Sequence, residues 1–63
     1  MEEVKQLWEG FMELVADADR RMKKFIEKGN KSAGTDVRKY MLRANEYAHD
    51  IRQAISKAKN TEN

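Results

Sequence analysis

The sequence predicts an all-α fold: an antiparallel hairpin of two helices (an αα-hairpin) that dimerises into a four-helix bundle. Apolar residues recur at alternating steps of four and three residues through both halves of the chain, which is helical spacing. Proline is absent, and no segment alternates with the period of two that is typical of strands. A single Gly29-Asn30 pair near the middle separates two long periodic segments, and the chain is expected to turn back there.

The first helix is expected over about residues 2–28. Its apolar positions form a heptad seam that should face the second helix. This seam comprises Val4, Trp8, Phe11, Val15, Ala18, Met22 and Phe25. A second stripe, Leu7 and Leu14, lies beside it, and Gly10 falls on the side that the pattern predicts to be exposed.

The turn is expected at residues 29–30. Gly29 can adopt the left-handed conformation that ends a helix, because it has no Cβ. Asn30 is a good N-cap for the next helix, with Thr35 as a later alternative start. A connection of two residues forces the helices to lie antiparallel.

The second helix is expected over about residues 31–59, followed by a frayed tail at 60–63, so that residues 1–63 form one domain. Its seam comprises Ala33, Val37, Tyr40, Ala44, Tyr47, Ile51, Ala54 and Ala58. Folding at the turn brings together residues whose numbers add up to about 59. Large residues on one seam then mostly oppose small ones on the other, as close packing requires.

A homodimer is expected because two helices of this kind leave apolar surface uncovered. The second stripe continues on the second helix as Met41, Ala48 and Ile55. A chain of 63 residues without cysteine has no disulfide to stabilise it, and a domain this small buries only about 60% of its unfolded surface. Association of two hairpins through this stripe is the remaining means of stabilisation.

The basic residues are concentrated around the turn. Residues 20–43 contain nine basic and two acidic side chains, a formal charge of +7, whereas the rest of the chain has four basic and nine acidic ones, or −5. The nine are Arg20, Arg21, Lys23, Lys24, Lys28, Lys31, Arg38, Lys39 and Arg43. Such a cationic end is typical of proteins that bind polyanions, nucleic acid above all. The alternative is a solubilising surface, with Lys24 and Lys28 complementing the dipole of the first helix.

The start of the second helix could add further phosphate contacts. Free backbone N–H groups and a positive dipole favour anions there. The hydroxyl groups of Ser32 and Thr35 could donate to phosphate oxygens, and Gly34 would allow a phosphodiester to approach closely. Plain capping by Asn30 and Thr35 explains the same residues equally well.

The basic segment lacks the features of a sequence-specific reader. No helix is rich in the Arg, Asn and Gln that read base edges, and no aromatic residues alternate with the cations as stacking platforms. We therefore expect sequence-nonspecific binding to the phosphate backbone of duplex DNA. The alternative function is a small adaptor that binds an acidic or amphipathic protein partner through the apolar stripe.

Other functions have no support in the sequence. His49 and Asp50 are neighbours on a helix and point about 100° apart, so they form no catalytic pair. With one histidine and no cysteine, no catalytic site, metal site or cofactor is expected, and neither is a small-molecule substrate. The N-terminal segment does not resemble a signal peptide, and no apolar run is long enough to span a membrane. The expected location is the cytoplasm, on the nucleoid.

The segment around the turn resembles a bacterial linker-histone-like DNA-binding family that includes the chlamydial histone-like protein. The resemblance rests on the run Glu27-Lys28-Gly29-Asn30-Lys31, the following Ala33-Gly34-Thr35 and the pair Arg38-Lys39. It extends over about residues 20–59.

The resemblance implies a nucleoid-associated protein that compacts DNA without reading its sequence. The residues matching the family would be DNA contacts (Lys28, Lys31, Arg38 and Lys39) or would shape the turn (Gly29, Asn30 and Gly34). Asp36 departs from the family pattern, and so does the C-terminal end, which lacks a long lysine/alanine tail. Strong condensation by these residues alone is therefore not expected.

Overall fold

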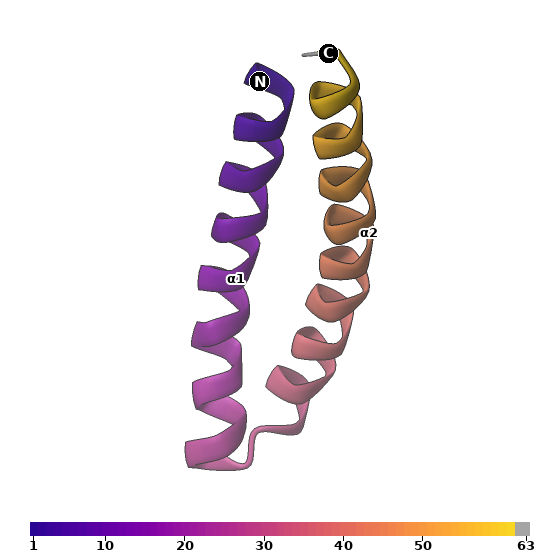
Figure 1. Ribbon diagram of the computed structural model, residues 1–63. Coiled ribbons are helices and arrows are strands. Elements are labelled where there is room, and N and C mark those ends of the chain that lie inside the picture. Colours follow the sequence, from indigo (N-terminus) through magenta and orange to yellow (C-terminus); the bar gives the residue numbers. More distant parts are fainter. Residues whose placement is uncertain (62–63) are drawn as a thin grey trace.

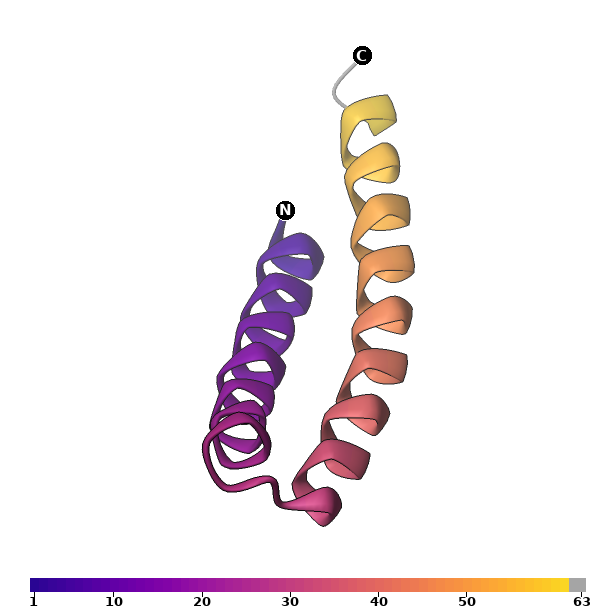
Figure 2. The same cartoon turned by 90° about the horizontal axis from the view of Figure 1, so that it is seen from below.

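The computed structural model of the chain describes residues 1–61. It consists of two helices, α1 (Glu2–Lys28) and α2 (Lys31–Thr61), arranged as an antiparallel hairpin 51 Å long. The start of α1 and the end of α2 lie at the end opposite the turn, and the helices run side by side in both views (Figures 1 and 2). No strand occurs within the described residues, so the predicted all-α hairpin is confirmed.

The second helix is longer than the sequence pattern indicated. It continues through Thr61, whereas its end was expected near residue 59 and a frayed tail from residue 60. The remainder of that predicted tail, residues 62–63, lies outside the described residues. No proline or glycine follows Lys59 to stop the helix, which explains its extension.

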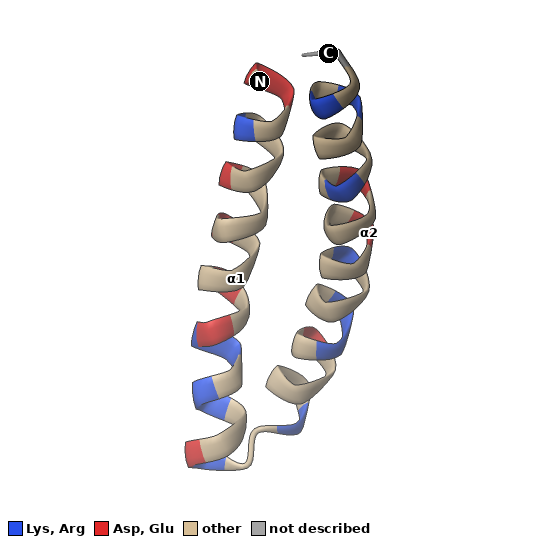
Figure 3. Ribbon diagram, in the orientation of Figure 1, with Lys and Arg blue, Asp and Glu red and all other residues tan. Residues whose placement is uncertain are grey.

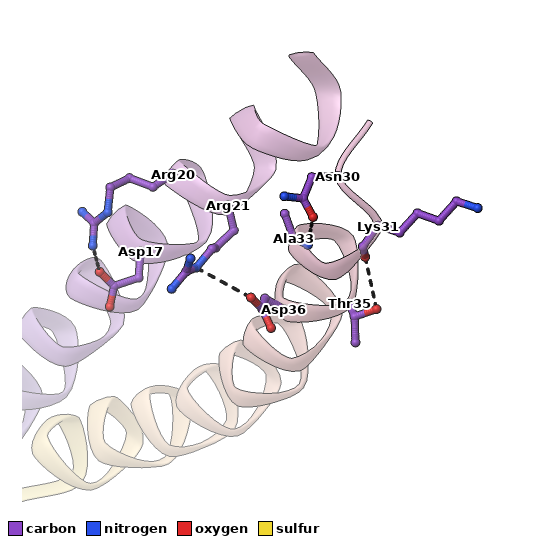
Figure 4. Close-up of polar contacts among 8 residues, drawn as sticks. All are labelled: Asp17, Arg20, Arg21, Asn30, Lys31, Ala33, Thr35 and Asp36. Carbon is purple, nitrogen blue, oxygen red and sulfur yellow. Dashed lines mark hydrogen bonds and ion pairs between the residues drawn. The ribbon is translucent and has the colours of Figure 1, made fainter. Parts of the chain in front are cut away.

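The turn has the local geometry that its two residues predict. Gly29 adopts the left-handed conformation, with φ 62° and ψ 25°, and its N–H donates to the carbonyl oxygen of Phe25 at 3.0 Å. The side-chain Oδ1 of Asn30 accepts a hydrogen bond from the N–H of Ala33 at 3.1 Å, as an N-cap does (Figure 4). One residue thus ends α1 and the next begins α2.

The buried face of α2 is the one predicted from its heptad seam. Ala33, Val37 and Ala54 are buried. The other seam residues are half-buried: Tyr40, Ala44, Tyr47, Ile51 and Ala58. The face of α2 toward α1 is therefore the expected one.

The face that α1 turns toward α2 matches the predicted one only in part: Ala18, Val4 and Phe11 of the seam are buried or half-buried, but other seam residues are not. Leu14 and Ala18 are buried, and Leu7 is half-buried. Four residues expected at the helix–helix contact are substantially exposed: Trp8 (52%), Val15 (39%), Met22 (39%) and Phe25 (44%). The assignment of Trp8, Val15 and Met22 to the interior was wrong. The stripe predicted to be external, Leu7 and Leu14, faces inward instead.

Close packing between Gly10 and Tyr47 explains this rotation of α1. Gly10 is half-buried, and a Cβ added to it would lie only 2.6 Å from Oη of Tyr47 and 3.0 Å from its Cε1. The Tyr47 ring also contacts Phe11 edge-on, with centroids 6.2 Å apart. Because only a glycine leaves room for the ring, this side of α1 turns toward α2. The expectation that Gly10 would be exposed was therefore also wrong.

Gly10→Ala is expected to destabilise the hairpin by about 1 kcal/mol, because the methyl group would overpack the Tyr47 ring. In a Tyr47→Ala background the same change should instead stabilise the protein, by up to about 1 kcal/mol, since alanine is the better helix former. Chemical denaturation of the four variants at one protein concentration measures this reversal of sign. A gain in stability from Gly10→Ala in the wild-type background would contradict the packing role.

Candidate nucleic-acid interface

The nine basic side chains of residues 20–43 converge on the turn end of the hairpin, here called the basic tip. They come from the last turns of α1 and the first turns of α2, as the colouring in Figure 3 shows. All are exposed except Arg21, which is half-buried. At the opposite end basic and acidic side chains alternate. The fold thus converts a run of sequence into one cationic end.

Three of the nine cations form ion pairs with carboxylates. Arg20 pairs with Asp17, three residues away on the same helix (Figure 4). Lys23 Nζ lies 3.1 Å from Oδ2 of Asp19. These two carboxylates precede the basic segment in sequence, and their proximity to it reduces the local charge.

The third ion pair joins the two helices. Nε of Arg21 lies 3.8 Å from Oδ2 of Asp36, and both side chains are more than two-fifths exposed. Pairs this exposed contribute at most about 1 kcal/mol, so a phosphate could replace the carboxylate at little cost. Asp36 therefore links α2 to a cation of α1 only weakly.

Six cations of the basic tip make no ion pair within the residues that the structure describes: Lys24, Lys28, Lys31, Arg38, Lys39 and Arg43. They lie on both helices and all are exposed to solvent. Six unneutralised like charges at one end of a small protein produce a strong positive potential, which attracts a polyanion.

Two clefts flank the basic tip on opposite sides of the hairpin. One, of about 250 Å³, is lined by Arg21, Asp36, Lys39, Tyr40 and Arg43. The other, of about 430 Å³ and here called the turn cleft, is lined by Met22, Phe25, Lys31, Gly34, Thr35, Val37 and Arg38. Their α2 residues fall on opposite sides of that helix at 3.6 residues per turn. The first cleft is mostly charged, whereas the turn cleft is apolar with cations among its lining residues.

Residues at the start of α2 have internal roles. The Thr35 hydroxyl donates to the carbonyl oxygen of Lys31 at 3.3 Å, so Thr35 does not cap the helix (Figure 4). A Cβ at Gly34 would lie 2.7 Å from Cδ1 of Phe25, and the absence of a side chain there is explained by close contact with that ring. Ser32 is exposed. Capping is performed by Asn30, and phosphate binding at this helix start stays a prediction.

The sequence matches a known protein family over almost its whole length. The fold and the basic tip define a small all-helical protein with one strongly cationic end. The match is to the family described as Histone H1-like protein Hc1 and covers residues 1–61, and the chain belongs to this family. It is a family of histone-like, DNA-binding proteins of the bacterial nucleoid, a structural and non-enzymatic class. The resemblance inferred from the turn segment is thereby confirmed.

Other comparisons add no further relative. No curated protein and no solved structure gives a significant match to this chain. Within the residues described, neither helix has an apolar segment long enough to cross a membrane.

Asn30→Ala is expected to lower the free energy of unfolding by about 1 kcal/mol, because the N–H of Ala33 loses its acceptor. Asn45→Ala removes the same side chain from an exposed position in the middle of α2 and should be neutral or slightly stabilising. Denaturation curves at matched protein concentration compare the two. Equal effects of both changes would show that the cap contributes nothing.

Proposed function

We propose that this chain binds duplex DNA without sequence preference, through the basic tip, as a nucleoid-associated protein in the cytoplasm. The observation that supports this most directly is the group of six exposed cations without carboxylate partners, drawn from two helices onto one end. Membership of the histone H1-like family supports the same partner.

The distribution of the cations favours contacts to phosphates over contacts to bases. They lie around the tip on both helices, and no single helix face presents a continuous row of base-reading side chains. Flexible lysine and arginine side chains at the surface adapt to a backbone whose geometry varies little with sequence. Binding of this kind gives the same affinity for most duplexes and a steep dependence on salt.

A homodimer is the second part of the proposal. Only five side chains of the described residues are buried: Leu14, Ala18, Ala33, Val37 and Ala54. The accessible surface is 5263 Å², against about 4,200 Å² for a compact monomer of this mass. The excess of about 1,000 Å² is close to what one subunit contributes to a standard interface.

The surface suited to this association is an apolar face opposite the charged cleft. Its members are Trp8, Met12, Val15 and Met22 on α1 with Met41 and Ile55 on α2, all of them exposed. At 3.6 residues per turn these positions lie on the same side of the two helices. Because Leu7 and Leu14 are internal, this face has a different composition from the stripe expected from sequence, though Met41 and Ile55 belong to both.

The charge distribution favours an antiparallel pair. A parallel arrangement would place the two +7 segments side by side, whereas an antiparallel one places each next to the −5 remainder of the other chain. An antiparallel four-helix dimer has a basic tip at each end. It can therefore contact two duplexes, or two segments of one duplex.

Changing Lys28, Lys31, Arg38 and Lys39 together to alanine should abolish most of the salt dependence of DNA binding. Six neutralised phosphates give a slope of log K against log salt of about −5, and two give about −2. Gel shifts of a random-sequence duplex across a salt series measure both slopes, and circular dichroism verifies that helicity is retained.

A matched control removes the same charge from the other end. Changing Lys5, Arg52, Lys57 and Lys59 to alanine should leave the slope near −5. If the tip variant binds DNA with an unchanged slope, the tip is not the interface, and the exposed apolar face would favour the adaptor function instead.

Val15→Asp is expected to disrupt the dimer, because it places a charge at the middle of the apolar face. Leu42→Asp, at an equally apolar but more exposed position away from that face (67% against 39%), should leave association unchanged. Sedimentation velocity at micromolar concentration measures the mass of each variant. A wild-type chain that sediments as a folded monomer would contradict the dimer.

A further inference from the structure

We propose that Trp8 of one protomer inserts into the turn cleft of a second copy of this chain. The inference rests on the antiparallel dimer proposed above and specifies its central contact.

Trp8 is a large aromatic side chain that the fold of one chain leaves half exposed. Its ring contacts Phe11, with centroids 5.6 Å apart, yet 52% of the residue is exposed. Tryptophan is among the residues most enriched at the centres of protein interfaces, where it fills a pocket on the partner. A ring held in place by Phe11 has little conformational freedom to lose on docking.

The spacing of the apolar face indicates which part of the partner lies opposite Trp8. Trp8, Val15 and Met22 are seven residues apart, so they occupy equivalent positions along one side of α1. In a two-fold symmetric interface, residue i contacts j while j contacts i. If the two-fold axis of an antiparallel dimer passes near Val15, Trp8 lies opposite the partner's Met22, because both residues are seven positions from Val15.

The turn cleft offers suitable chemistry at that level. Its volume is about 430 Å³, and Met22, Phe25 and Val37 supply apolar lining. A methionine sulfur contacts aromatic rings favourably. Lys31 and Arg38 also line the cleft, and either cation could lie against the face of an indole.

Gly34 contributes to the shape of the cleft. Because it has no side chain, the Phe25 ring lies against α2 there instead of being displaced outward.

Trp8 cannot reach this cleft within its own chain. Thr35, which lines the cleft, lies level with about residue 24, and sixteen helical residues separate that level from Trp8, or about 24 Å. Any contact between the two must therefore occur between protomers. The chain has one tryptophan, which is therefore its only indole fluorophore, and no cysteine, so an introduced cysteine is the only site for a thiol-reactive label.

The test uses contact quenching of Trp8 between two chains. One chain is wild type. The other carries Trp8→Phe and Thr35→Cys, with a nitroxide on the cysteine, so that it quenches but does not emit. With the labelled chain in excess, we expect loss of most of the tryptophan fluorescence. In the control the nitroxide is on Lys39→Cys, which lines the charged cleft on the opposite side, and the emission should change little.

Sedimentation of the same mixtures separates the possible outcomes. Dimers without quenching from position 35 would overturn the Trp8 contact and leave the dimer intact. Equal quenching from positions 35 and 39 would also overturn it, because the contact would then not be specific to the turn cleft. Monomers throughout would overturn both the contact and the dimer, while DNA binding by the basic tip would stand as a separate result.

Discussion

Reversal of the chain within two residues is the constraint on which the whole structure depends. Gly29 adopts a left-handed conformation that costs an L-residue with a side chain about 1–2 kcal/mol, and Asn30 immediately caps the next helix. If the helix continued through this point, the chain would be a single rod with its cations spread along the middle. The turn instead brings cations from two helices to one end, and leaves the rest of the chain with an acidic excess.

The difference in charge between the two ends of the hairpin bears on both DNA binding and dimerisation. The basic tip is crowded with like charges, which repel one another and lower the stability of the isolated hairpin. Three carboxylates that form ion pairs with its cations, those of Asp17, Asp19 and Asp36, offset part of this repulsion without neutralising the tip. Both proposed partners would relieve the remainder: DNA phosphates at the tip, and the acidic end of a second hairpin along the side.

Periodicity and turn chemistry predicted the helices, the turn and the inward face of α2 from sequence. The face of α1 was not predictable in this way, because two apolar stripes, one with Leu7 and Leu14 and one with Trp8 and Val15, run one residue apart with the same spacing. Choosing between them requires knowing that Gly10 leaves room for Tyr47, a contact between residues 37 positions apart. Similarly, the sequence locates the basic tip, but only the structure distinguishes its paired cations from its unpaired ones. The intrahelical pair of Arg20 and Asp17 could have been anticipated from their spacing of three.

The length of the hairpin has a consequence for how DNA could be held. Its long dimension of 51 Å corresponds to about fifteen base pairs of B-form DNA at 3.4 Å each, or about one and a half helical turns. In a dimer with its two-fold axis near Val15 the two turns lie about 43 Å apart at 1.5 Å per residue, or about thirteen base pairs, so the two phosphate-binding ends do not fall on the same side of a straight duplex. An antiparallel dimer therefore has a geometry better matched to joining two neighbouring duplexes, or to a duplex that curves around it, than to lying along one straight segment.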